Sequence, residues 1–576
     1  MKLKKVFFIV PLILLLGGIT SCARNLRNLN DGTFIGSGVG RNGNIEVEIT
    51  VTNGKIVAAK VLNDKETPEI AEEAKNEILQ KFLTDGTTSQ LDTLSGATIT
   101  TNGLLDALDA AVAAAQGLEA SDVSYHDTEC DIVIIGAGGA GLVAATEAAS
   151  KGAGVIVLEK QGVAGGNSNN STGGINASYT KEQERLGIRD SKDVFFNDTM
   201  RGGQYLNNTA LVHKLVDESA RMVEWLQSPM IGADLSDVGM FGGATNKRIH
   251  RPKGGGAIGA HLIPLLHKAA LKQGAEIRFN NRVVDIISKG GRAAGVKVRY
   301  KDKEYKIMAK SVIITTGGFG ANPKLIEFYQ PALAGFATTN NPGSTGDAFA
   351  MVEKFDAALV HMEQIQIHPT VVKGSGFMIS EAVRGNGAIL VYKNGTRFIN
   401  EIETRNIVSG AVLRGKEKSA FLIFDQGIRD SLKVIDSYAK FSWMIEAPSI
   451  KELAEKAKID PQALEQTVQN YNQSVELKRD DEFGRNPSSM ERKIENAPFY
   501  AIEIEPAIHH TMGGLKINTE AQVINKAGNP IPGLYAAGEV TGGIHGAERL
   551  GGNAVADFCI FGKIAADSAV NYIRFK

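Results

Sequence analysis

The stretch Cys130–Gly141, with the sequence CDIVIIGAGGAG, determines the fold of most of this 576-residue chain. Its apolar first half predicts a buried strand, and its glycines then follow in the spacing G-x-G-x-x-G. Residues 142–150 continue as an alanine-rich helix, and Val155–Leu158 predicts a second strand that ends at Glu159. In such a βαβ unit a pyrophosphate lies at the helix N-terminus, and an acid about 20 residues further on binds ribose hydroxyls. The spacing therefore predicts a dinucleotide-binding α/β domain.

Two later segments resemble the parts that close the FAD site in flavoproteins of the two-dinucleotide-binding type. They are Thr315–Gly320 (TTGGFG) and Gly533–Val540 (GLYAAGEV). A simple nicotinamide enzyme has no use for such a segment so far beyond the first glycine loop, so the resemblance implies FAD. The loop Gly165–Ser168 resembles the one that meets the flavin. Related membrane-bound succinate dehydrogenases and fumarate reductases carry a histidine there for covalent FAD, whereas this chain has Asn167 and Ser168, which predicts non-covalent FAD.

Five further segments, in family order, resemble the fumarate reductase flavoprotein family and most closely its soluble flavocytochrome c members. The segments are His368–Thr370, Met378–Gly387, Phe398–Glu401 with Thr404–Arg405, His509–Gly514 and His545–Asn553. The resemblance implies an FAD-dependent enzyme that reduces the carbon–carbon double bond of a small unsaturated carboxylate, with fumarate as the favoured substrate. An FMN domain is expected in place of the cytochrome domain of those enzymes.

A dicarboxylate substrate needs cationic and hydrogen-bonding partners at both ends, and arginine offers a planar bidentate fit. A hydride must reach one alkene carbon and a proton the other. The resemblance implies that Arg549 and His509 hold one carboxylate, that His368 and Ser380 hold the other, and that Arg405 donates the proton, which comes from solvent through Glu381 and Arg384. A plainer interpretation stays open for Glu381 and Arg384, because three positions apart is also the spacing of a helical ion pair.

The substrate is less certain than the reaction. His368 keeps the dicarboxylate pattern, but Ser380 stands where fumarate reductases of this group usually carry threonine, and the missing methyl group enlarges the pocket. Urocanate or another acrylate is therefore an alternative substrate. A non-enzymatic lipoprotein that shuttles electrons between partners through its flavins is a third hypothesis.

The expected fold is α/β: an FAD domain of the two-dinucleotide-binding type at residues 129–362 and 506–576, with an inserted α+β cap domain at residues 363–505. The cap is expected to close over the flavin and exclude water. The FAD-binding residues implied by the resemblance are Gly136, Gly138, Ala140, Gly141, Glu159, Lys160, Gly166, Asn167, Ser168, Gly174, Gly317, Asp347, Gly538, Glu539, Gly552, Asn553, Ala554 and Val555.

Residues 31–118 predict a separate small α+β domain. Apolar residues alternate along 45–51, Asn53-Gly54 is a hairpin signal before a strand at 55–62, and helices are expected at 68–83 and 102–115. The segment Asp92–Thr100, DTLSGATIT, matches the D-x-x-S-G-A-T-x-T segment of FMN-binding domains. The resemblance implies that Thr100 carries FMN through a phosphoester made by a dedicated FMN transferase, with Ser95 and Thr98 near the phosphate. The alternative is a Ser/Thr-rich turn that caps a helix.

The first 21 residues predict a lipoprotein signal peptide. Lys2, Lys4 and Lys5 precede an apolar core at 6–16, which is too short to span a bilayer. Residues 19–22, ITSC, resemble a lipobox, in which Cys22 is lipidated and followed by a linker to residue 30. The alternative is an ordinary secretory signal. We expect the protein to lie on the extracytoplasmic face of the cell membrane, where a quinol- or NADH-linked membrane donor supplies electrons.

The composition excludes several other classes. A net charge of −1 argues against a nucleic-acid partner, because phosphate binding needs an excess of Lys and Arg. Only three cysteines are present, so neither a disulfide framework nor a multi-cysteine metal site is expected. No metal ligand set is predicted.

Overall fold

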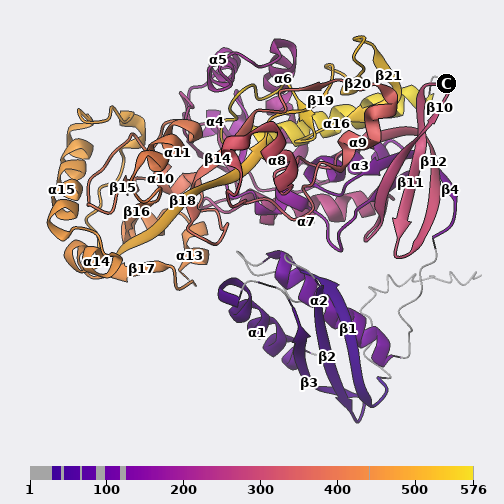
Figure 1. The fold of residues 1–576 in the computed structure, drawn as a ribbon, viewed down its shortest axis with the longest axis horizontal. Coiled ribbons are helices and arrows are strands. Elements are labelled where there is room, and N and C mark those ends of the chain that lie inside the picture. The colour runs from indigo at the N-terminus through magenta and orange to yellow at the C-terminus, as the bar shows by residue number, and fades with distance from the viewer. Residues whose placement is uncertain are drawn as a thin grey trace, which may run out of the picture.

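The computed structural model describes residues 29–40, 44–64, 66, 68–85, 98–116, 125–439 and 441–574. Their buried hydrophobic side chains form three clusters, each the core of one folded unit. Figure 1 shows the backbone of these units. The first draws on residues 29–115, the second on 132–362 and 508–570, and the third mainly on 372–504. The expected signal segment and Cys22 lie outside the described residues. Within the described part, no helix has the length and apolarity that crossing a membrane requires.

The N-terminal unit is a three-stranded antiparallel sheet with two helices. Its elements are β1 (Gly32–Val39), β2 (Asn44–Thr52), β3 (Lys55–Asn63), α1 (Pro68–Asp85) and α2 (Thr98–Ala115), with strand order β1-β2-β3. Glycines let α2 lie close against β1, because a Cβ on Gly38 would lie only 2.0 Å from the Gly103 carbonyl oxygen. The expected strands and helices are confirmed. The structure adds β1 and starts α2 at Thr98 instead of Asn102.

The second unit is built on an eight-stranded sheet in the order β10-β11-β12-β4-β5-β9, extended from β12 by β21 and β20. Its strands are β4 (Thr128–Ile135), β5 (Val155–Leu158), β9 (Glu276–Arg278), β10 (Arg282–Lys289), β11 (Arg292–Tyr300), β12 (Lys303–Ile314), β20 (Gln522–Ile524) and β21 (Pro530–Ala536). Strands β21, β12, β4, β5 and β9 are parallel neighbours, and α3 (Gly139–Ser150) connects β4 to β5. The predicted βαβ unit is therefore confirmed.

Helices pack beside this sheet, and the glycine turn after β4 is tightly packed. Helices α7 (Ile258–Lys272) and α16 (Asn553–Arg574) pack against α3. A Cβ on Gly141 would lie 2.0 Å from the Gly136 carbonyl oxygen, so only glycine fits this turn. The remaining elements are β6 (Ile175–Asn176), α4 (Lys181–Arg185), α5 (Lys192–Gly202), α6 (Thr209–Gln227), β7 (Asp237–Gly239), β8 (Ile249–Arg251), α8 (Pro323–Tyr329), α9 (Asp347–Val352), β13 (Leu359–Val360), β19 (Gly514–Lys516) and β22 (Thr541–Gly542).

The third unit, the cap, is an antiparallel sheet in the order β14-β18-β16-β15, with β17 also paired to β18. Its elements are β14 (Ile365–Val372), α10 (Glu381–Gly385), β15 (Ile389–Val391), α11 (Arg405–Arg414), β16 (Ala420–Asp425), α12 (Gln426–Asp430), α13 (Val434–Tyr438), β17 (Met444–Ala447), α14 (Ile450–Ala457), α15 (Pro461–Leu477) and β18 (Phe499–Thr511). The long strands β14 and β18 run from the cap into the second unit, and Figure 1 shows them bridging the two. Gln366 on β14 lies opposite His510 on β18. These strands therefore bring side chains of both units together.

A buried ion network holds the loop that precedes α11. Arg397 donates to Glu401 at 2.7 Å and to Asp480 at 2.8 Å, and Arg485 donates to Glu401 at 3.1 Å. Arg485 also donates to the Arg384 carbonyl oxygen at 2.6 Å. Each buried charge has an opposite partner, which is the condition under which such charges are tolerated. The network fixes the approach of the chain to Arg405.

Candidate active site

One elongated cavity runs from the glycine loop to the cap. Its wall includes Gly138 and Gly139 at the start of α3, and Phe377, Met378 and Tyr438 from the cap. The N-cap residue of α3, Gly138, has no side chain to cap the helix, and the N–H of Gly139 donates to Ser168 Oγ at 3.2 Å. The positive end of a helix of this kind favours a phosphate. This end of the cavity fits the pyrophosphate of a dinucleotide.

Most of the predicted FAD-binding residues line this cavity. They are Gly136, Gly138, Ala140, Glu159, Lys160, Gly166, Asn167, Ser168, Gly174, Gly317, Asp347, Gly538, Glu539, Gly552, Ala554 and Val555. Gly141 and Asn553 do not line it. Gly141 closes the glycine turn from behind, and Asn553 pairs with Asn176 at 2.7 Å and with Thr199 at 3.2 Å. These two residues therefore support the site without facing it.

Glu159, for which the spacing predicts a ribose contact, follows β5 and lines the cavity. It is buried, and its carboxylate accepts hydrogen bonds from the N–H groups of Ala137 and Gln161, both at 2.9 Å. Burial raises the pKa of Glu159. Nearby, Lys160 donates to Thr345 at 2.7 Å and pairs with Asp347 at 3.1 Å.

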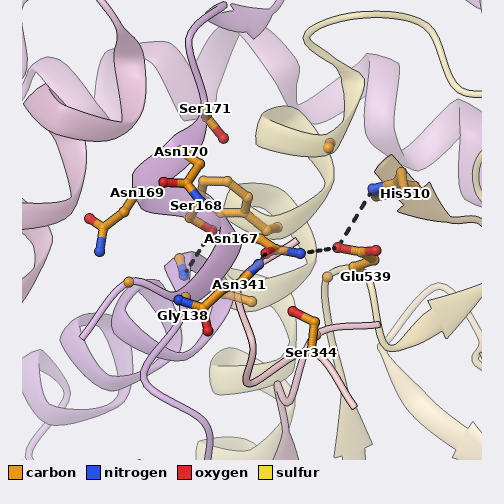
Figure 2. A pocket seen from close by; sticks show the side chains of 18 of the residues that line it. Gly138, Asn167, Ser168, Asn169, Asn170, Ser171, Asn341, Ser344, His510 and Glu539 are labelled. Carbon is orange, nitrogen blue, oxygen red and sulfur yellow. Dashed lines mark hydrogen bonds and ion pairs between the residues drawn. The ribbon is translucent and has the colours of Figure 1, made fainter. Parts of the chain in front are cut away.

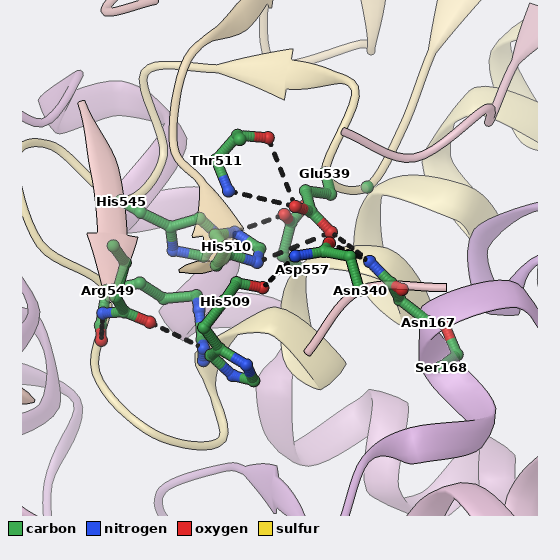
Figure 3. Close-up of polar contacts among 12 residues, drawn as sticks. Asn167, Ser168, Asn340, His509, His510, Thr511, Glu539, His545, Arg549 and Asp557 are labelled. Atoms are coloured by element: carbon green, nitrogen blue, oxygen red, sulfur yellow. Dashed lines mark hydrogen bonds and ion pairs between the residues drawn. The ribbon is translucent and has the colours of Figure 1, made fainter. Parts of the chain in front are cut away.

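A buried polar network lies beside the loop that is expected to meet the flavin (Figures 2 and 3). Glu539 accepts from the backbone N–H of Thr511 at 3.0 Å and from Asn167 Nδ2 at 3.4 Å, and His510 Nδ1 lies 3.6 Å away. Burial raises the pKa of Glu539 and lowers that of His510 well below its ordinary value. His510 is therefore a neutral imidazole in this environment. Its Nε2 has no hydrogen-bond partner among the described residues.

Sequence reasoning missed Asp557 in the same network. Its carboxylate lies within hydrogen-bond distance of His545 Nε2, at 3.1 Å. The ring of His545 lies edge-on to that of His510, with the ring centroids 5.4 Å apart. Asp557 lines the cavity, and its Oδ1 has no partner among the described residues. It stands three positions after Ala554 on α16, and this helical spacing from a predicted cofactor residue was the available signal.

Five of the predicted catalytic residues come together at the cap end of the cavity: His368, Glu381, Arg405, His509 and Arg549. The rings of His368 and His509 lie 5.1 Å apart. Burial, and then the neighbouring Arg405, hold the pKa of both histidines well below the ordinary range, so both rings are neutral.

His368 has a defined donor. Its Nδ1 accepts from the backbone N–H of Thr370 at 3.3 Å, so in the neutral ring the proton is on Nε2. That Nε2 is buried and has no partner among the described residues. His509 Nδ1 pairs with the Thr339 hydroxyl at 2.7 Å. An oxyanion in the cavity would therefore meet at least one N–H donor whose tautomer the protein has already set.

Gln366, which sequence reasoning also missed, holds the two arginines together. Its Oε1 accepts from Arg405 Nη1 and from Arg549 Nη2, both at 2.9 Å. Its Nε2 donates to the Glu548 carboxylate and to the Arg549 carbonyl oxygen. Gln366 stands two positions before His368 on β14, and alternate strand residues share a face, so the histidine motif pointed to it.

The two arginines lie in unusually desolvated surroundings. Burial, and then the charge of Arg405, lower the pKa of Arg549 to about 9. Burial raises the pKa of Glu548 to about 7, although the Gln366 contact and both arginines oppose this. Two buried cations this close repel each other, and a dianionic ligand between them would relieve that repulsion.

Glu381 and Arg384 extend from Arg405 into the cap. The Glu381 carboxylate accepts from Arg405 Nε and from the Gly242 N–H, both at 2.8 Å. Burial raises the pKa of Glu381, but Arg405 and Arg384 outweigh it, and the net shift is downward. Arg384 Nη2 lies 3.9 Å from Glu381, and burial lowers the pKa of Arg384 to about 10. Arg384 is fully buried, so this pair does not by itself reach solvent.

Ser380 is placed differently from the expectation. It is fully buried, is absent from the cavity wall, and its hydroxyl caps α10 by accepting from the Ala382 N–H at 3.3 Å. Its own N–H donates to the Tyr438 hydroxyl at 3.0 Å, and Tyr438 does line the cavity. In this arrangement the Ser380 hydroxyl caps α10 and does not line the cavity.

The predicted FMN attachment segment is described only in part. Ser95 lies outside the described residues, and Thr98 begins α2. Thr100, in the first turn of α2, is buried, and its hydroxyl donates to the Glu66 carboxylate. Among the described residues no cluster of His, Cys, Asp and Glu has the arrangement of a metal site.

Comparisons with known proteins agree with this geometry. The FAD binding domain family matches residues 131–555, and the FMN-binding domain family matches residues 40–113. A fumarate reductase (cytochrome) of Shewanella frigidimarina is 45% identical over 451 residues, which cover 78% of this chain and 78% of that protein. A urocanate reductase of Eggerthella lenta is 30% identical over 560 residues, covering 93% of this chain and 92% of that protein.

Among solved structures, the open conformation of a flavocytochrome c3 fumarate reductase matches with a TM-score of 0.65 at 40% identity. The match covers 78% of this chain and 79% of that one. Both the FAD domain and the FMN domain of the expected fold are therefore confirmed, with FAD and FMN as the cofactors. The chain belongs to the fumarate reductase flavoprotein family, with an N-terminal FMN-binding domain, and is an FAD-dependent oxidoreductase that reduces carbon–carbon double bonds.

Proposed function

We propose that this enzyme reduces fumarate to succinate, with electrons that pass from a membrane donor through FMN to FAD. The observation that carries the proposal is the cluster of two buried arginines and two neutral histidines at the cap end of the cavity. Arg405 and Arg549 supply two positive charges, and the fixed Nε2–H of His368 supplies a neutral donor. This set matches a small dianion with a carboxylate at each end.

FAD, when bound, supplies hydride chemistry at its N5, and the cavity residues do the rest. Arg549 and His509 hold one carboxylate, and His368 holds the other. Arg405 is aimed by two acceptors, Glu381 and Gln366, and delivers the proton to the second alkene carbon. Arginine is a weak acid, but Glu381 lies 2.8 Å from its Nε and returns a proton to it.

The cofactors are held in different ways in this proposal. FAD is non-covalent, because Asn167 and Ser168 stand where covalent relatives carry histidine. FMN is covalent, attached through a phosphoester at Thr100 by an FMN transferase. Lipidation at Cys22 anchors the protein on the extracytoplasmic face of the cell membrane, next to a quinol- or NADH-linked donor.

A substrate panel tests the proposal. Protein loaded with both flavins is turned over without oxygen, with a reduced dye as donor, and is offered fumarate, urocanate, cinnamate, acrylate and methacrylate in parallel. Fast dye oxidation with fumarate alone supports the dicarboxylate assignment. Turnover with only one of the others keeps the reaction and replaces the substrate. An electron shuttle would show reducible FAD and no turnover with any of the five.

Urocanate is the second candidate. Its support is the pair of aromatic side chains Phe377 and Tyr438, which line the cavity. An imidazole ring packs favourably against such a wall. Fumarate is the first candidate because it offers one carboxylate to Arg549 and His509 and another to His368, whereas urocanate has only one carboxylate.

A further inference from the structure

The hydroxyl of Thr100 is already paired with a carboxylate. Thr100 is 2% exposed and Glu66 is 7% exposed, and the Thr100 hydroxyl donates its hydrogen bond to Glu66 Oε2. The two residues are 34 positions apart, so the fold makes this contact, not the local chain. The proposed function attaches FMN to the Thr100 hydroxyl, and the inference below rests on that assignment.

The fold holds both the backbone and the carboxylate of Glu66 in place. The N–H of Glu66 donates to Asp64 Oδ1 at 2.9 Å, and Asp64 Oδ2 accepts from the buried Lys75 at 2.6 Å. On the other side, Gly40 leaves the space that the carboxylate fills. A Cβ on Gly40 would lie 2.6 Å from Glu66 Oε1. The position of this carboxylate is therefore built by the fold.

Thr100 is held equally firmly. It belongs to the first turn of α2, one turn before Gly103, and α2 lies against β1 at van der Waals contact through Gly38. Gly40 follows β1 directly, so the end of β1, the first turn of α2 and the Glu66 side chain converge at one point. Both the hydroxyl and its acceptor are thus set on rigid elements, which is the arrangement that a proton transfer requires.

We propose that Glu66 is the base that takes the Thr100 proton when FMN is attached. A threonine hydroxyl is a weak nucleophile until a base removes its proton. In the step, Thr100 Oγ1 attacks the flavin-side phosphorus of FAD, a flavin phosphoanhydride, and the new P–O bond forms as the pyrophosphate bond breaks. The nucleoside monophosphate leaves with the electron pair, and the proton goes to Glu66. No atom is oxidised or reduced.

The same residue suits the product. A charged carboxylate beside the new phosphoester would be repelled, whereas the protonated Glu66 is neutral and is a hydrogen-bond donor to a phosphoester oxygen. If Glu66 only stabilised the fold, its protonation would not change during attachment. The two roles therefore differ in the pH dependence of the attachment rate.

The experiment follows covalent flavin on the full chain. Flavin-free protein is incubated with purified FMN transferase and FAD, and the mass of the intact protein is followed with time over a range of pH. Glu66→Gln keeps an oxygen that accepts from Thr100 but loses basicity, and its attachment rate is expected to fall by about 100-fold or more. Glu66→Asp should restore part of the rate. Gly40→Ala, which displaces the carboxylate without removing it, should also be slow.

Controls separate this inference from the attachment site itself. Glu72→Gln removes an exposed carboxylate that pairs with the same Lys75 and should react at the wild-type rate. If Thr100→Ala still gains covalent flavin, the proposed attachment site is wrong. If wild type is modified at Thr100, and Glu66→Gln is modified equally fast with the same pH profile, only the role of Glu66 is overturned. Protection of the FMN domain from limited proteolysis verifies that this domain is folded in each variant. If Glu66→Gln does not fold, Glu66→Asp and Gly40→Ala carry the test.

Discussion

At the scale of single residues, the site depends on how Arg405 is aimed. Its guanidinium is fixed by Glu381 and Gln366, and neither contact uses the whole donor set of an arginine, so donors remain for the substrate and for proton transfer. The prediction that Arg405 is the proton donor came from family resemblance. The structure adds the positional reason, because a carboxylate partner 2.8 Å away is in place to return the proton.

Removing this side chain should therefore abolish most of the chemistry. Arg405→Ala is expected to lower kcat for fumarate by about 10²–10⁴-fold, the range for a lost general acid. The matched control is Arg414→Ala at the exposed end of the same helix α11, which should keep wild-type turnover. Stopped-flow oxidation of pre-reduced FAD by fumarate measures the step directly. Retention of the wild-type rate in Arg405→Ala would remove Arg405 from the mechanism.

Glu548 gives a pH prediction whose sign can be worked out. Its pKa is raised to about 7 from an ordinary 4.5, so the folded state binds this proton more tightly than the unfolded state does. The contribution of Glu548 to the free energy of unfolding is therefore greatest below about pH 4.5. This contribution is lost as the pH rises through 7, by up to about 3 kcal/mol. Glu548→Gln keeps an acceptor for Gln366 and should remove this dependence. Melting temperatures of flavin-free protein at pH 5 and pH 8 measure it, and equal pH slopes in variant and wild type would contradict it.

Some of these residues were predictable from sequence and others were not. The arginines and histidines lie in motifs whose spacing resembles a family, and the cavity brings Arg405, Arg549, His368 and His509 together. Gln366 and Asp557 lie outside the motifs, and only their strand or helix spacing from predicted site residues pointed to them. The role of Gln366 became clear only from the structure, in which its Oε1 accepts hydrogen bonds from both arginines.

At the scale of elements, α10 decides where Ser380 points. The sequence predicted a substrate contact because the position follows a family motif, yet the hydroxyl caps the helix and the N–H is held by Tyr438, 58 positions away. A cap of this kind is local chemistry, but the tyrosine contact is tertiary and has no sequence signal. The start of α2 was likewise predicted too late, because the Ser/Thr-rich segment before Asn102 suggested a turn that caps the helix.

Substitution of Ser380 separates the two roles. If the hydroxyl only caps α10, Ser380→Ala should lower the free energy of unfolding by about 1 kcal/mol and leave KM for fumarate nearly unchanged. Ser380→Thr keeps the cap and should behave as wild type in both measurements. Steady-state kinetics and denaturant unfolding of both variants decide the matter. A large increase of KM in Ser380→Ala with unchanged stability would restore the substrate contact.

At the scale of the whole molecule, the three cores follow the parts that the sequence predicts: a small sheet with two helices, a parallel sheet with a glycine loop, and an inserted cap. This much was predictable because each unit has its own pattern, alternating strands in the first and the βαβ unit in the second. The cap was the hardest to derive, because its long strands β14 and β18 join it to the FAD domain and blur the border between them.

The order of electron flow belongs to this scale. Thr100→Ala should block reduction of FAD by the natural membrane donor but leave turnover with a small reduced dye unchanged, because the dye reaches FAD without FMN. The measurement compares the two donors in membrane vesicles, with the same FAD content in both proteins. Full activity with the membrane donor in Thr100→Ala would show that electrons bypass the FMN domain.

The central claim is that two cations select a dianion, and one ratio tests it most directly. We would measure kcat/KM for fumarate and for its monoamide, which has the same carbon skeleton and one negative charge fewer. A lost charge-assisted hydrogen bond costs about 1.5–3 kcal/mol, which predicts a preference for fumarate of about 10- to 150-fold. Equal values for the two substrates would contradict the account, because the second arginine would then contribute nothing to recognition.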